Sequence, residues 1–148
     1  MKKLLLATAA TALTAGAAMA EGHGETVKMG VILGFTGPIE SLTPAMADSA
    51  ELAMKEINDA GGLLGGKMLE AVRADSTCVD AAGATAAAER LITSDGVVAI
   101  MGADCSGVTG AILTNVAVPN GIVMVSPSAT VRSSVWRMVT RPCSPQST

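Results

Sequence analysis

Three segments rich in small polar side chains could bind a ligand, and each follows an apolar run. They are residues 34–43, 102–106 and 126–130. In open parallel α/β sheets, the ligand crevice lies beyond the carboxyl ends of the strands, where the strand order reverses. Ser106 is the sharpest candidate because a helix is expected to begin there. The free N–H groups and dipole of a helix start favour an anion, so the sequence predicts a site for a small carboxylate.

The proposed site depends on how the helix begins at Ser106. With Ser106 as the N-cap, the N–H groups of Gly107, Val108 and Thr109 would be free to bind a carboxylate together with the Ser106 hydroxyl. The alternative is that Ser106 only caps its helix.

Catalytic and phosphate-binding motifs are missing from the sequence. Gly102 and Gly107 have the spacing of the glycines in a phosphate-binding loop, but Val108 stands where that loop has lysine. The only histidine, His23, lies in a Gly-rich lead-in, and no Gly-x-Ser-x-Gly elbow is present. Single aspartates in loops are usually turn formers or caps. That interpretation applies to Asp75, Asp80 and Asp104. We therefore expect no catalytic residues, cofactor or metal, and an exported hydrolase is the weakest alternative.

The composition is that of one globular domain. Of the 148 residues, 49% are apolar and 16% charged, whereas disordered chains have less apolar and more charged sequence. The formal net charge of -3 argues against nucleic acid or an anionic membrane as the main partner. The length allows one domain, or half of a two-lobed protein.

The first twenty residues have the order of a secretory signal peptide. A basic start is followed by an uncharged apolar run over residues 4–17 and a small-x-small site at 18–20. The run is shorter than the roughly 20 residues that a membrane span needs. We expect residues 1–20 to be removed on export, so that the mature chain begins near Glu21.

Four apolar runs predict strands, and the segments between them predict helices. Thr43 is expected to cap the first helix, with Pro44 at its first position. The alternation predicts a three-layer, doubly wound parallel sheet of βαβαβαβ order, with helices on both faces. We expect strands at residues 27–33, 68–74, 97–101 and 122–125, and helices at about 43–60, 80–94 and 106–118.

Export places the cysteines Cys78, Cys105 and Cys143 in an oxidising compartment, where two can pair. We prefer Cys78 with Cys105, because this bond closes a loop that holds one helix and one strand. Three free thiols are the alternative. The tail, residues 131–148, has three basic residues and no acidic one. Its texture fits a frame-shifted or truncated end, or an ordinary surface tail.

Several of these segments carry a resemblance to a known family. Residues 27–38, 53–62 and 65–67 look like the opening of periplasmic branched-chain amino-acid-binding proteins, and residues 99–102 and 126–130 match later segments. The resemblance implies the first lobe of a type I periplasmic-binding fold, here residues 21–130, with the second lobe absent. It also implies a monomer in the periplasm that serves an ATP-driven importer and its permease subunits.

The resemblance also implies residue roles. Ser106 and Thr130 would hold the α-carboxylate of an amino acid through hydroxyl and backbone N–H groups. The Ser128 carbonyl and the Thr130 hydroxyl would bind the α-ammonium, with Ala129 between them. The pair Cys78–Cys105 matches the disulfide of the family.

The expected ligand is a branched-chain amino acid or a similar small amino acid or amide. Residues 39–43 lack the aromatic that family members often place against the ligand, so urea and other small carboxylates stay open. A missing second lobe implies weak binding or none. A ligand-sensing regulatory module of the same fold is the alternative function.

Overall fold

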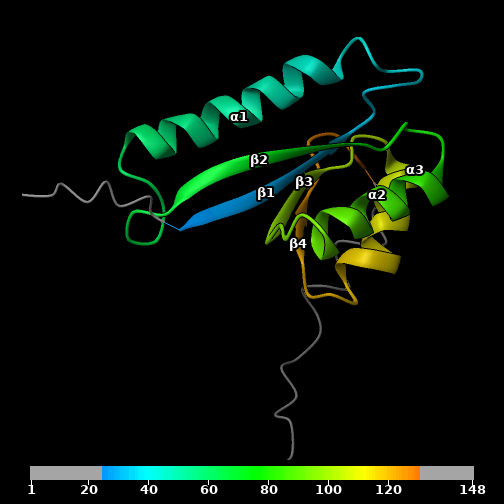
Figure 1. Ribbon diagram of the computed structural model, residues 1–148. Coiled ribbons are helices and arrows are strands. Elements are labelled where there is room, and N and C mark those ends of the chain that lie inside the picture. The colour runs from blue at the N-terminus through cyan, green and yellow to red at the C-terminus, as the bar shows by residue number, and fades with distance from the viewer. Residues whose placement is uncertain (1–24, 131–148) are drawn as a thin grey trace, which may run out of the picture.

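The computed structural model describes residues 25–130 (Figure 1). The predicted signal peptide, the tail at 131–148 and Cys143 lie outside the described residues. The elements, in chain order, are β1 (Thr26–Leu33), α1 (Thr43–Asp59), β2 (Met68–Asp75), α2 (Ala81–Thr93), β3 (Ala99–Gly102), α3 (Ser106–Ile112), the π-helical turn η1 (Leu113–Ala117) and β4 (Val123–Val125). The four strands are parallel, in the order β2-β1-β3-β4.

Helices cover both faces of the sheet, α1 on one side and α2 and α3 on the other (Figure 1). Successive residues of a strand point to opposite faces, so the central strand β1 supplies both cores. Val31 and Leu33 pack with Ala47 and Met54 of α1. Ile32 lies in the second core, among residues of α2 and α3. The predicted three-layer, doubly wound parallel fold is confirmed.

The strand order reverses between β1 and β3. β2 lies on one side of β1, and β3 and β4 follow on the opposite side of β1. In open α/β sheets, ligands bind at the carboxyl ends of the strands where the order reverses, which here is the end that carries the loops after β1 and β3. The sequence predicts the site there.

The N-terminus of α1 differs from the prediction. Its N-cap is Leu42, and Thr43 lies inside the helix without a side-chain capping bond. The fully buried Thr43 hydroxyl instead donates to the carbonyl of Gly34 at 3.0 Å. A long-range bond therefore replaces the expected local cap and fastens α1 to the loop after β1.

Two strands begin later than predicted. Pairing in β3 starts at Ala99, because the Val97 N–H donates to the carbonyl of Leu91 and closes the end of α2. In β4, pairing starts at Val123, because the Ile122 N–H donates to Ala117. Within residues 25–130, no helix combines the length and apolar character needed to cross a membrane.

Candidate functional site

The structure brings Ser106 and Thr130 together at the carboxyl ends of β3 and β4. The Thr130 N–H donates to the Ser106 Oγ at 3.1 Å, although the two residues are 24 positions apart. Ser106 is half-buried and Thr130 is exposed. The Ser106 hydroxyl accepts this bond and so keeps its own hydrogen for another acceptor. The two residues therefore share one location, and their role in ligand binding stays a prediction.

The start of α3 lies one residue earlier than predicted. Cys105, not Ser106, is the N-cap, and it makes no side-chain capping bond. The Thr109 N–H, predicted to be free, donates to the Cys105 carbonyl at 2.9 Å. Among residues 25–130, the N–H groups of Ser106, Gly107 and Val108 have no hydrogen-bond acceptor. These are the donors that the helix start offers to an anion.

Side chains after β4 bind the backbone of the loop after β3. The Ser126 Oγ accepts from the Ala129 N–H at 2.8 Å and donates to the Ala103 carbonyl. The Ser128 hydroxyl donates to the Asp104 carbonyl at 2.8 Å. The Ser128 side chain is thus engaged within the protein, and its predicted ligand contact is its backbone carbonyl.

Asp104 joins two loops, a role that was not predicted from the sequence. Its buried carboxylate accepts from the N–H groups of Gly34 and Cys105, each at 2.9 Å. It thereby ties the loop after β1 to the loop after β3. The available signal was its position at the end of β3, beside the reversal in strand order. Asp80, by contrast, is the predicted cap: it is the N-cap of α2 and accepts from Ala82 N–H.

Cys78 and Cys105 are joined in the structure, with their Cα atoms 5.2 Å apart. This separation lies within the usual range for disulfides. Cys78 follows β2, and Cys105 directly precedes Ser106. The preferred cysteine pair therefore links the loop after β2 to the start of α3.

The comparisons with known proteins assign this arrangement to a family. A family model described as periplasmic binding protein matches residues 26–147. The chain belongs to the periplasmic binding protein family. The match includes residues 131–147 of the tail. Whether this tail is a frame-shifted, a truncated or an ordinary end stays a prediction.

This periplasmic binding protein is similar to proteins that bind branched-chain amino acids and to other solute-binding proteins of ABC transporters. A Leu/Ile/Val-binding protein homolog from Brucella abortus is 40% identical over 107 residues, which cover 72% of the chain and 25% of the relative. LivJ from Streptococcus pneumoniae, a branched-chain amino acid transporter substrate-binding protein solved with isoleucine, gives a TM-score of 0.67 at 35% identity over 74% of the chain and 30% of LivJ. An ABC transporter solute-binding protein from R. palustris, solved with benzoate, gives 0.60 at 29% identity over 70% of the chain and 28% of that protein. The chain spans about a quarter to a third of the length of these relatives.

The carboxylate of Asp75, at the end of β2, is held by hydrogen bonds that favour its charged form. Its carboxylate accepts from the Thr36 hydroxyl at 2.5 Å and the Thr77 N–H at 2.8 Å. Burial acts to raise the pKa of Asp75, but the hydrogen bonds from Thr36, Thr77 and Phe35 lower it by more, so its pKa lies below the ordinary 3.8.

The lowered pKa of Asp75 predicts the sign of a pH effect. The unfolded chain binds the proton at higher pH than the folded chain, so the stabilisation is fully present above about pH 4 and is lost as pH falls through the folded pKa. Asp75→Asn should flatten the fall in the free energy of unfolding in urea titrations between about pH 5 and pH 2. A variant whose curve stays parallel to the parent curve would contradict this.

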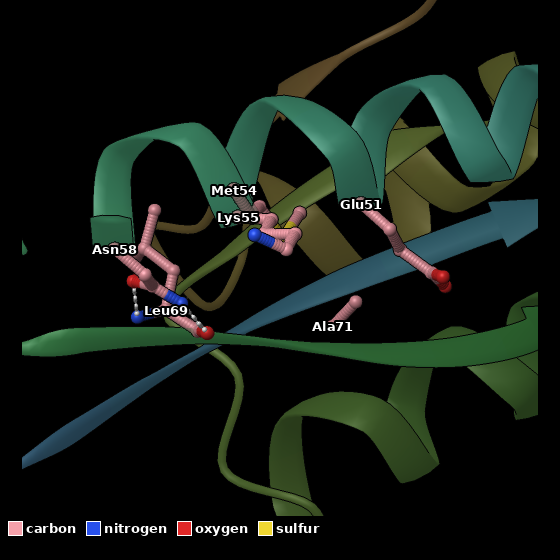
Figure 2. A pocket seen from close by; sticks show the side chains of 6 residues that line it. All are labelled: Glu51, Met54, Lys55, Asn58, Leu69 and Ala71. Atoms are coloured by element: carbon pink, nitrogen blue, oxygen red, sulfur yellow. Dashed lines mark hydrogen bonds between the residues drawn. The ribbon is translucent and has the colours of Figure 1, made fainter. Parts of the chain in front are cut away.

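The described residues also form a hollow of 320 Å³ between α1 and β2 (Figure 2). It lies at the β2 edge of the sheet and contains none of the predicted site residues. No group of three or more metal-ligating side chains occurs in the described part of the chain. The hollow is lined by Glu51, Met54, Lys55, Asn58, Leu69 and Ala71.

Proposed function

We propose that this periplasmic binding protein captures a small carboxylate, a branched-chain amino acid or a similar small amino acid, for an ABC importer in the periplasm. The bond between Thr130 and Ser106 carries the proposal, because it places both residues beside the free N–H groups at the start of α3. Relatives support it: the ligands in the two solved structures, isoleucine and benzoate, share a carboxylate. We propose no catalytic role.

The recognition of the carboxylate follows from the hydrogen bonds of Ser106. Its Oγ accepts from the Thr130 N–H, which polarises the hydroxyl and strengthens the bond that it can donate. A carboxylate oxygen placed before α3 would accept that hydrogen together with N–H groups of Gly107 and Val108. The helix dipole favours the same charge.

The α-ammonium would be bound by the Ser128 carbonyl and the Thr130 hydroxyl, which are neutral groups. The carboxylate of Asp104, two residues before Ser106, already accepts two backbone bonds and is buried. A charged partner for the ammonium would come from a second lobe. Because closure of two lobes supplies much of the affinity in hinged binding proteins, we expect weak binding by this chain.

Export and disulfide formation are part of the same proposal. Residues 1–20 would direct the chain to the periplasm, where Cys78 and Cys105 oxidise and fix the start of α3 beside Ser106. The permease subunits of the importer would be the protein partners, and the binding protein would act as a monomer.

Calorimetric titration with isoleucine, leucine and benzoate tests the proposal. We expect weak binding by the 148-residue chain and tight binding by a fusion completed with the remaining residues of the Brucella abortus relative. In that fusion, Ser106→Ala should weaken binding by about 10- to 100-fold, the effect of losing one hydrogen bond to a charged group.

Ser49→Ala is the matched control. Ser49 is also a helical serine with one hydrogen bond, donated to the Ala45 carbonyl at 2.7 Å, but it is exposed on α1 and makes no contact with Ser106 or Thr130. We expect no change in affinity for this variant. A correctly folded fusion that responds to no amino acid or amide would overturn the proposed function.

A further inference from the structure

The outer edge of the sheet at β2 is occupied by a side chain. Asn58 of α1 donates from Nδ2 to the Leu69 carbonyl at 2.9 Å and accepts at Oδ1 from the Leu69 N–H at 2.7 Å (Figure 2). Backbone groups of a strand point alternately to its two neighbours, and β1 already lies on one side of β2. The Leu69 groups therefore point to the place that a fifth strand would occupy.

The Asn58 amide satisfies Leu69 as one peptide group of a neighbouring strand would, with one donor and one acceptor. Ala71 and Arg73 follow Leu69 at intervals of two, so their backbone groups point to the same open edge. The Arg73 side chain reaches α1, where its guanidinium binds Glu51 through two bonds, the longer of 2.9 Å. Asn58 and Arg73 thus hold α1 along this edge.

The two edges of the sheet differ. β2 has eight residues, and an exposed edge of that length is a template for pairing with another chain. β4 has only three residues, and its exposed Val123 and Val125 receive no comparable side-chain bond within the described part of the chain. Of the two edges, only the longer one, at β2, therefore has its backbone bound by a side chain, that of Asn58, within the described residues.

We propose that Asn58 keeps the outer edge of β2 closed to pairing with the same strand of a second copy of this chain. A second copy is the occupant that fits, because two β2 edges related by a two-fold axis are self-complementary. Antiparallel pairing would give partners to the free backbone groups of Ala71 and Arg73 in both copies at once. The Asn58 contact competes directly with that pairing at Leu69.

Asn58→Leu tests the proposal, because leucine keeps the branched shape of the side chain and removes both bonds. Sedimentation velocity should show dimers that increase with concentration beyond any seen for the parent chain. Amide hydrogen exchange at residues 69–73 should slow as the dimers form. Asn58→Asp keeps an acceptor for the Leu69 N–H and adds a charge at the edge, so we expect it to associate no more than the parent.

Asn120→Leu is the matched control. The Asn120 side chain also donates to a backbone carbonyl, that of Val116 at 2.8 Å, but it follows η1 and is remote from β2. We expect this variant to match the parent. Equal association of the Asn58→Leu and Asn120→Leu variants, or none in either, would overturn the proposal.

A measurement on the parent chain tests the contact without any variant. The amides of Leu69 and Ala71 point to the same edge, but only the first is bonded to Asn58. The Leu69 amide should exchange roughly tenfold more slowly than the Ala71 amide, the protection expected from one hydrogen bond. Equal exchange rates at dilute concentration would overturn the proposal, even if the Asn58→Leu variant fails to fold.

Discussion

Replacing Gly102 by alanine is expected to lower the free energy of unfolding by about 2–5 kcal/mol. Gly102 ends β3 with φ at +131°, and a Cβ built there would lie 1.9 Å from the Ile32 carbonyl oxygen. Backbone of the central strand cannot move aside cheaply. Overpacking costs about 1–3 kcal/mol and left-handed backbone about 1–2 kcal/mol more, a large share of the roughly 5–15 kcal/mol that stabilises a domain.

Urea unfolding followed by circular dichroism measures this loss. Gly110→Ala is the control, because Gly110 lies in α3 and a Cβ there would meet nothing within 4 Å. Alanine at that helical position should raise the free energy of unfolding by about 0.5–1 kcal/mol. A Gly102→Ala variant that unfolds at the same urea concentration as the parent would contradict the expected clash.

Loss of the Cys78–Cys105 bond is expected to lower the free energy of unfolding by about 3–4 kcal/mol, as the loop-entropy relation gives for cysteines separated by 27 positions. The bond restricts the unfolded chain, and it also anchors the residue that precedes Ser106. Urea unfolding with and without reductant measures the effect. The variant with Cys78→Ser and Cys105→Ser should match the reduced parent.

Cys143→Ser provides the comparison for the cysteine experiment. Cys143 lies outside the described residues, and the preferred pairing leaves it out. This variant should keep the full response to reductant. If Cys143→Ser removed the response as completely as the double substitution, the assigned pairing would be wrong.

The sequence predicted the elements and their order because its signals are local. Apolar runs such as residues 29–33 mark strands, and glycine pairs such as Gly61-Gly62 mark helix ends. The meeting of Ser106 with Thr130 also follows from sequence, since carboxyl ends of neighbouring parallel strands share one edge of the sheet. Element order and a rule of topology were sufficient for both.

The cap of α2 at Asp80 was predicted, but the caps of α1 and α3 were not, because hydroxyls in their first turns bind carbonyls outside the helices. The Thr43 hydroxyl donates to the Gly34 carbonyl and makes no capping bond in α1. The Thr109 hydroxyl donates to the Ala103 and Cys105 carbonyls, and α3 has Cys105 as its N-cap. Such bonds leave no periodic pattern in a single sequence.

Asp104 and Asn58 escaped prediction for a related reason. Asp104 binds the N–H of Gly34, 70 positions away, and Asn58 binds Leu69 across a turn. An isolated aspartate after a strand resembles a turn residue, and an isolated asparagine on a helix resembles its polar surface. Only the folded chain shows that each satisfies backbone groups.

Gly34 has both of its backbone groups committed inside the protein. Its N–H donates to the Asp104 carboxylate and its carbonyl accepts from the Thr43 hydroxyl. Its single N–H is therefore not available to a ligand. A ligand bound at the carboxyl ends of the strands would meet free backbone donors at the start of α3 and none at Gly34.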